Sequence, residues 1–155
     1  ISESKKSSDE LNRLKDVARE IGTFVIPASI KTEQEISLLQ EDEKKEYLDL
    51  MGMKEPVLNK IIFEGYKMLG LRTFFTAGPN EIRAWTIKKN TEAQKAAGVI
   101  HSDFEKNFIR AEVVSYDDFK RYGSFEKAKE NGKLKVEGKN YFVKDGDVLV
   151  FRVNP

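Results

Sequence analysis

The 155-residue chain carries 27 basic and 26 acidic side chains, for a net charge of +1, and 39% of its residues are hydrophobic. This composition excludes a disordered tail, because it provides enough apolar material for a core. The absence of cysteine excludes disulfides and thiolate metal sites. No apolar run approaches the ~20 residues of a membrane-spanning helix, so we expect a globular cytoplasmic protein without a membrane partner.

The first 70 residues are expected to be mostly helical. Ser7 and Glu10 have the spacing of a capping box, and the apolar residues after them recur at helical intervals, which predicts a helix to about Glu20. A short branched apolar run at 23–26, stopped by Pro27, predicts a buried strand. Three more helices are predicted, one opening at the capping box Thr32–Glu35, one over residues 43–51 and one over residues 56–69.

Beyond Gly70 the apolar pattern changes from a helical to an extended period. The predicted elements are strands at 73–76 and 81–87 joined by a turn, a helix at 91–97 ended by Gly98, a strand at 108–114, a helical stretch at 115–131, and strands at 141–143 and 148–151. An Asp-Gly pair at Asp145 is typical of a tight turn between the last two strands. This order predicts an α+β fold, a small mixed sheet wrapped on a helix as in ubiquitin-like β-grasp proteins.

Charge is distributed unevenly between the two halves. Residues 1–70 hold 11 basic and 14 acidic groups, net −3, whereas residues 71–155 hold 16 and 12, net +4. A positive surplus of this size could attract a polyanion such as RNA, or it could be ordinary scatter of surface charge. Both alternatives remain open from composition alone.

Several unusual strings after Gly70 carry a resemblance to a known family. Residues 74–87 read Phe-Phe-Thr-Ala-Gly-Pro-Asn-Glu-Ile-Arg-Ala-Trp-Thr-Ile, and the match continues through 96–106 and 108–113 to 145–148 and 151–154. They resemble the TGS domain of YchF-type Obg-like ATPases. The resemblance implies a β-grasp TGS domain at 71–155, preceded at 1–70 by the C-terminal α/β and helical end of a P-loop nucleotide-binding domain.

The resemblance also places part of a nucleotide pocket in the first 70 residues. The segment 26–31 resembles the family's last nucleotide-contacting loop, with Ile30 in the place of an alanine. Residues 1–3 resemble the tail of the family's base-selecting motif, although an ordinary chain terminus is the alternative. The residues implied at the base end of the pocket are Ile1, Ser2, Glu3, Ser29 and Ile30.

No Gly-x-x-x-x-Gly-Lys-Ser/Thr motif occurs in the chain, so the backbone cradle for phosphates and the hydroxyl ligand for Mg²⁺ are missing. We therefore expect no catalytic residue, no bound cofactor and no nucleotide hydrolysis from this chain alone. The chain also begins without methionine, which is typical of a fragment, a processed form or a remnant of something longer. The resemblance implies that the intact protein is an ATPase that uses ATP or GTP with Mg²⁺ in an upstream domain.

Two aromatic side chains have competing interpretations. His101 is the only histidine, so a zinc site would lack ligands, and a loop hydrogen bond or an RNA contact is expected instead. Trp85 lies between Arg83 and Lys88, where it could stack on a base, but a strand tryptophan favours the core.

The ribosome or RNA is the expected partner of the TGS domain, and the oligomeric state is left open. The candidate phosphate contacts, which we expect to share one face, are Arg83, Lys88, Lys89, Lys95, Lys106 and Arg110. The same residues could instead form a solvated polar edge with no ligand. The resemblance to a TGS domain favours phosphate contacts over that alternative. The alternative function is a β-grasp module that binds another protein and regulates the NTPase.

Overall fold

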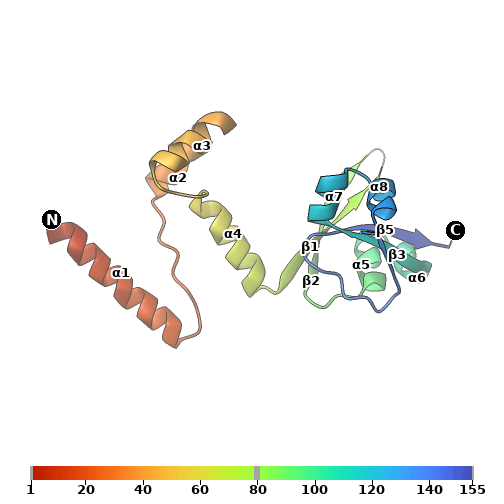
Figure 1. Ribbon diagram of the computed structural model, residues 1–155. Helices are drawn as coiled ribbons and strands as arrows, with labels where there is room; N and C mark the ends of the chain where they lie inside the picture. The colour runs from red at the N-terminus through yellow and green to blue at the C-terminus, as the bar shows by residue number, and fades with distance from the viewer. Residues whose placement is uncertain (1, 79–80, 155) are drawn as a thin grey trace. The chain divides into compact units, whose positions relative to one another are not determined.

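The computed structural model describes residues 2–78 and 81–154. The chain divides into two units, Ile1–Gly65 and Tyr66–Pro155. The N-terminal unit is helical, and the C-terminal unit combines a five-stranded sheet with short helices (Figure 1). Within the described part of the chain, no helix has both the length and the apolar character needed to cross a bilayer.

The N-terminal unit consists of helices without a strand among its described residues. Its elements are α1 (Ser2–Glu20), α2 (Ile30–Leu38), α3 (Glu41–Leu50) and most of α4 (Val57–Met68). The predicted start of the first helix at Ser7 is wrong, because α1 extends back to Ser2 through a segment that contains neither proline nor glycine. The strand predicted at 23–26 is also wrong. No described strand lies beside this segment to accept and donate ladder hydrogen bonds.

The start of α2 lies two residues before the predicted capping box. Ser29 is the N-cap, and its hydroxyl oxygen accepts the main-chain N–H of Thr32 at 3.3 Å and the Thr32 hydroxyl at 2.9 Å. A serine hydroxyl at the N-cap satisfies a donor that the helix itself cannot. The sequence pattern therefore located the helix correctly but assigned its cap to the wrong residue.

The N-terminus of α4 is capped from α2. The carboxylate of Glu33 accepts the main-chain N–H of Val57 at 2.8 Å and that of Leu58 at 3.2 Å. These charge-assisted bonds satisfy two of the free donors at the helix start, where the helix dipole also favours a negative charge. This contact ties α2 to α4 within the N-terminal unit.

The C-terminal unit is built on a mixed sheet with the strand order β2-β1-β5-β3-β4. Its strands are β1 (Leu71–Ala77), β2 (Ile82–Lys88), β3 (Phe108–Ser115), β4 (Lys135–Glu137) and β5 (Asp147–Val153). β1 and β5 are parallel, and the other neighbours are antiparallel. The predicted hairpin and the strands predicted at 108–114 and 148–151 are confirmed. Turn residues 79 and 80 lie outside the described residues.

The strand predicted at 141–143 is wrong. Phe142 makes a single isolated bridge with Glu92, and the fourth strand is instead β4, which pairs with β3. The apolar character of this segment comes from core packing, because Val143 is buried and Tyr141 packs against the same core. The true strand was missed because it reads Lys-Val-Glu and lies exposed at the sheet edge.

Two helix boundaries also differ from the prediction. Gly98 does not end a helix but lies inside α5 (Ala93–Ile100), where α6 (Ser102–Lys106) approaches closely. A Cβ added at Gly98 would lie 3.1 Å from the Cβ of Glu105, so close helix packing explains this glycine. The stretch predicted at 115–131 is two helices, α7 (Tyr116–Tyr122) and α8 (Phe125–Glu130), separated by Gly123 in the left-handed conformation with φ 78°.

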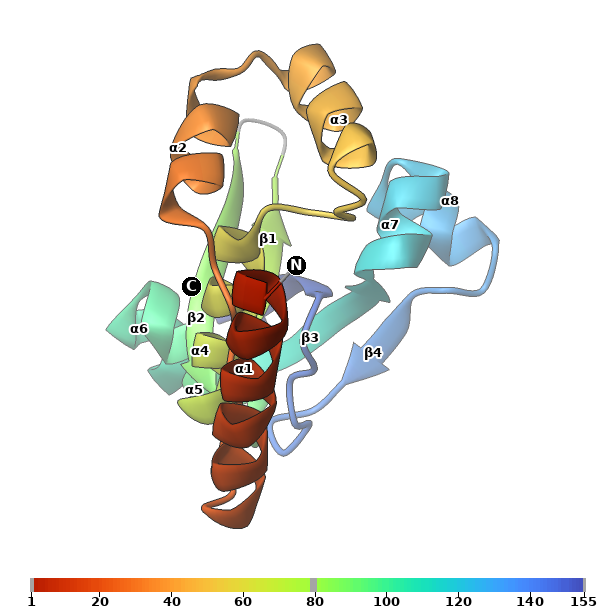
Figure 2. The same ribbon diagram turned by 90° about the vertical axis from the view of Figure 1, so that its left-hand side faces the viewer.

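Helices cover both faces of the sheet, with α5 and α6 on one side and α7 and α8 on the other (Figures 1 and 2). The core between the sheet and α5 consists of Phe74, Ile87, Ala93, Ala96, Ala111, Val113, Val143 and Leu149. On the α7 side, Val114 and Val148 are buried, and the ring of Phe75 lies 5.8 Å from that of Tyr116. The central strands therefore bury alternate side chains on both faces.

Candidate functional site

The residues predicted for the nucleotide base pocket are only partly described. Ile1 lies outside the described residues, and Ser2 and Glu3 begin α1, where the side chains are not described. Ser29 and Ile30 lie together at the start of α2, and Ile30 is 78% exposed. The hydroxyl oxygen of Ser29 caps the helix, and the side chain of Ile30 beside it is exposed.

The six predicted phosphate-binding residues do not share one face. Arg83 and Lys88 are five positions apart in β2, and side chains in a strand alternate between its two faces. Arg83 therefore points to the side of the sheet that carries buried Ile87, whereas Lys88 points to the opposite side. The expectation of a single basic face is wrong, because it depended on position along the chain and not on strand alternation.

Three of the six lie close to carboxylates. Lys95 on α5 is 3.9 Å from Glu92, and Lys106 on α6 is 4.0 Å from Asp103. Arg110 on β3 is 3.7 Å from Glu112. Each of these cations is therefore partly neutralised by a neighbour.

The other three form the more available group. Within residues 2–78 and 81–154, no carboxylate forms an ion pair with Arg83, Lys88 or Lys89. The ammonium group of Lys88 donates a hydrogen bond to the carbonyl of Leu69 at 3.2 Å, and its charge is not compensated there. We call Arg83, Lys88 and Lys89 the β2 cations.

Trp85 belongs to the core, as its strand position favoured. Its ring is partly buried and packs against the core cluster, while its indole N–H donates to the Thr76 hydroxyl at 2.9 Å. The guanidinium carbon of Arg83 lies 4.6 Å from the centroid of the same ring. This cation–π contact orients Arg83 and covers a ring that would otherwise be available for stacking.

His101 makes the loop hydrogen bond expected of it. It is the N-cap of α6, where its Nδ1 accepts the main-chain N–H of Asp103 at 3.2 Å. Across the part of the chain that the structure describes, no group of three or more His, Asp or Glu side chains could hold a metal ion.

The pattern of residues gave no signal for an ion cluster between β3 and β5. Nε and Nη2 of Arg152 donate to Oε1 and Oε2 of Glu112 at 3.1 and 2.8 Å, and Arg110 lies beside the same carboxylate. This bidentate hydrogen bonding from Arg152 lowers the pKa of the Glu112 carboxyl below its usual range. The cluster was missed because the register that places Arg110 opposite Arg152 arises only when the strands pair.

Replacing Glu112 with glutamine should remove a pH-dependent contribution to stability. Because the folded-state pKa of Glu112 is lowered, the contribution is present above the pKa of the unfolded chain and disappears as the pH falls through the folded value. We expect Glu112→Gln to lower the free energy of unfolding by about 1 kcal/mol near pH ~7 and to have no effect near pH ~2. Urea denaturation over that range measures the difference.

The matched control is Glu130→Gln, an exposed carboxylate of α8 for which no ion pair is found among the described residues. Its effect should be within about 0.5 kcal/mol at every pH. A Glu112→Gln effect of equal size at both ends of the pH range would contradict the assigned ion pair.

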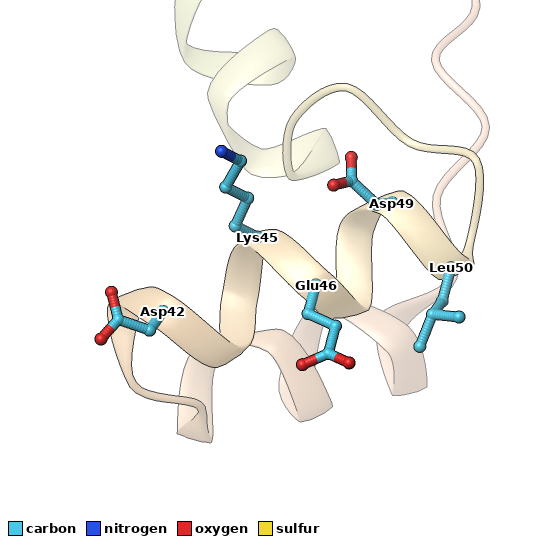
Figure 3. Close-up of a pocket in the computed structure, with 5 residues that line it drawn as sticks. All are labelled: Asp42, Lys45, Glu46, Asp49 and Leu50. Carbon is cyan, nitrogen blue, oxygen red and sulfur yellow. The ribbon is translucent and has the colours of Figure 1, made fainter.

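A shallow hollow lies beside α3. Its lining is Asp42, Lys45, Glu46, Asp49 and Leu50, all of which project from this one helix (Figure 3). A single helix lines it, so it lacks the converging groups of several elements that a small-molecule site requires.

Comparisons with known proteins identify relatives of the chain. The family model YchF-GTPase_C, described as "Protein of unknown function (DUF933)", matches residues 71–154. The chain is 52% identical over 144 residues to the ribosome-binding ATPase YchF of Pasteurella multocida, covering 93% of this chain and 40% of that protein. It is 50% identical over 133 residues to Obg-like ATPase 1 of Xenopus laevis, covering 86% of this chain and 33% of that protein.

Two solved structures are similar to the chain. The structure of the Schizosaccharomyces pombe YchF GTPase matches with a TM-score of 0.75 and 37% identity, covering 84% of this chain and 34% of that one. A GTP-binding protein from Pyrococcus horikoshii OT3 shares the fold at 17% identity, with a TM-score of 0.64 over 94% of this chain and 42% of that one. The chain thus spans about 40% of the length of the YchF relatives that it matches.

Proposed function

Because the chain belongs to the YchF family of Obg-like ATPases, we propose that its C-terminal unit is a β-grasp TGS domain that binds RNA and docks a longer ATPase onto the ribosome. The mixed sheet, with parallel β1 and β5 at its centre and α5 packed across one face, supports the β-grasp assignment. The ribosome-binding ATPases among the relatives support the ribosome as the partner.

The β2 cations are the observation that carries this proposal. Arg83, Lys88 and Lys89 lie on or directly after an exposed edge strand and have no ion-pair partner within the described ranges. Cations without a neighbouring carboxylate lose less electrostatic energy when a phosphate approaches, and phosphate contacts position RNA without reading its sequence. The proposed binding is therefore electrostatic and independent of sequence.

The N-terminal unit is proposed to be the end of a nucleotide-binding domain. In the intact cytoplasmic protein, Ser29 and Ile30 would lie with Ile1, Ser2 and Glu3 at the base end of a pocket for ATP or GTP. The phosphate-binding loop and the groups that hold Mg²⁺ would come from residues outside this chain, because the motif that provides them is missing here. Hydrolysis is thus assigned to the intact protein and not to this part of it.

Replacing Lys88 and Lys89 together with alanine tests the RNA-binding proposal. The free energy of unfolding should change by less than about 0.5 kcal/mol, because both side chains are exposed. Affinity for unrelated RNA oligonucleotides and for ribosomes should fall by a similar factor. The slope of log affinity against log salt concentration should shrink by about two, one unit for each lost contact. Fluorescence anisotropy titrations at several salt concentrations measure both quantities.

The matched control removes the same charge elsewhere. Lys120 on α7 and Lys127 on α8 are exposed, and their joint replacement with alanine should leave the salt slope unchanged. Intact binding with an unchanged slope in the Lys88/Lys89 variant would reject these lysines as contacts. Loss of a protein partner with unaltered RNA affinity would favour the alternative, a protein-interaction module that regulates the NTPase.

A further inference from the structure

The outer edge of β2 presents main-chain groups that the sheet does not use. β2 is the first strand in the sheet order, so only one of its edges pairs with β1. The main-chain N–H of Lys89 donates to Gly70 at 2.6 Å, and that of Gly78 donates to Glu81 at 2.9 Å. In an antiparallel pair, hydrogen-bonded positions alternate with positions whose main-chain groups point away. The odd-numbered positions of β2 therefore bond β1, and the even-numbered positions point outward.

Three consecutive outward positions are open. Ile82, Ala84 and Thr86 are all exposed, with Ile82 at 70%. Within the described ranges, none of their main-chain N–H or C=O groups has a hydrogen-bond partner. The open stretch ends at Lys88, whose carbonyl already accepts the N–H of Thr91 at 3.2 Å. A row of free donors and acceptors along an edge strand is a template for one more strand.

The charge of the strand indicates what kind of segment would pair with it. β2 contains two cations and no anion, and Lys89 follows directly. A second copy of the same strand would bring no anion to these cations, whereas an acidic strand would, and opposite charges across a strand pair are stabilising. Arg83 and Lys88 point to opposite faces, so acidic side chains on either face of an added strand would find a cation.

We propose that the open edge of β2 binds an extended acidic segment of another protein by β-strand addition. The main chain of Ile82, Ala84 and Thr86 would supply the ladder hydrogen bonds, and the β2 cations would select for acidic side chains. The exposed side chains of Ile82 and Ala84 lie on one face, where apolar branched residues at alternate positions of the segment would pack against them. The main-chain ladder at Ile82, Ala84 and Thr86 is distinct from the proposed phosphate contacts, and the two binding modes share the β2 cations.

The first test uses the unaltered chain and a defined probe. The probe is a synthetic peptide of about ten residues, a usual upper length for a strand, that alternates valine with threonine and carries glutamates at both ends. Amide exchange measured by NMR should slow at Ile82, Ala84 and Thr86 when the peptide is added. A peptide with lysines in place of the glutamates should bind at least about tenfold more weakly. Absence of binding by the acidic peptide, or slowed exchange confined to other strands, would overturn the proposal.

The second test removes one outward donor. Ala84→Pro deletes an N–H that faces solvent, a position at which an edge strand tolerates proline, and should weaken peptide binding by about tenfold or more. Ala84→Thr keeps the N–H and is the matched control, with affinity expected within about twofold of the parent. If Ala84→Pro binds the peptide as tightly as Ala84→Thr, strand addition at this edge is excluded. If the proline variant does not fold, the amide-exchange measurement on the unaltered chain decides whether the peptide adds a strand at this edge.

Discussion

Replacing Phe74 with alanine is expected to lower the free energy of unfolding of the C-terminal unit by about 3–5 kcal/mol. The side chain is completely buried in β1, and its ring packs edge-on against Phe151, with the centroids 6.0 Å apart. The variant would lose both the transfer free energy of the ring and the contacts around the cavity left behind. Since small domains are stable by only about 5–15 kcal/mol in total, much of the unit should be unfolded at moderate denaturant concentrations.

Urea denaturation followed by tryptophan fluorescence measures this effect directly. Trp85 is the only tryptophan and packs against the same core, so its emission reports on that core. Phe142→Ala is the matched control, because Phe142 is 56% exposed and should cost about 1 kcal/mol or less. Equal losses in the two variants would show that Phe74 does not occupy the centre of the core.

The second large effect is expected at Asp147. This residue is only 6% exposed, and its Oδ2 accepts the hydroxyl of Tyr141 and the main-chain N–H of Lys144, both at 2.8 Å. Asp147→Ala would leave these two donors without a partner, which should cost about 2–4 kcal/mol. Tyr141→Phe removes only one of the two hydrogen bonds and should cost about 1 kcal/mol. Denaturation of the two variants and of the double variant gives the coupling between them.

The same contact predicts a change at high pH. Burial, followed by the hydrogen bond to Asp147, raises the pKa of the Tyr141 hydroxyl above its ordinary value. The folded chain therefore keeps this hydroxyl protonated at a pH where the unfolded chain ionises it. Stability from this group is complete below a pH of about 10 and is lost as the pH rises further. In Tyr141→Phe the decline above that pH should be smaller, and an identical decline would contradict a raised pKa of the Tyr141 hydroxyl.

Local signals explain which parts of the fold could be predicted. The β1–β2 hairpin has branched and aromatic residues on either side of a turn, and β5 is an apolar run after an Asp-Gly turn, so the sequence located them closely. β4 could not be found, because a three-residue polar edge strand exists only through its pairing with β3. The segment around Tyr141 was misassigned because its apolar side chains pack in the core although its main chain forms only one isolated bridge within the described part of the chain.

The candidate site was also predictable only in part. Residue type identified the basic side chains, and Lys88 and Lys89 remain candidates for phosphate contact. Which face each cation occupies depends on strand alternation. The carboxylates beside Lys95, Lys106 and Arg110 lie only two or three positions away in the sequence, so spacing along each element could have identified these three ion pairs. The Arg152–Glu112 ion pair could not be predicted, because its two residues are 40 positions apart and meet only when β3 pairs with β5. The open edge of β2 likewise follows from the sheet order.

The parallel pairing of β1 with β5 has a consequence for how the C-terminal unit folds. β1 is the first strand in the sequence, and it pairs with the last strand, β5. Phe75, for example, lies opposite Val148. During synthesis the β1–β2 hairpin can form early, but the middle of the sheet stays open until β5 has emerged. Contacts of such high sequence separation slow folding, and apolar strand surface exposed in the interval is prone to aggregate. The unit is therefore expected to reach its native state in one late step and not by gradual growth from its N-terminal end.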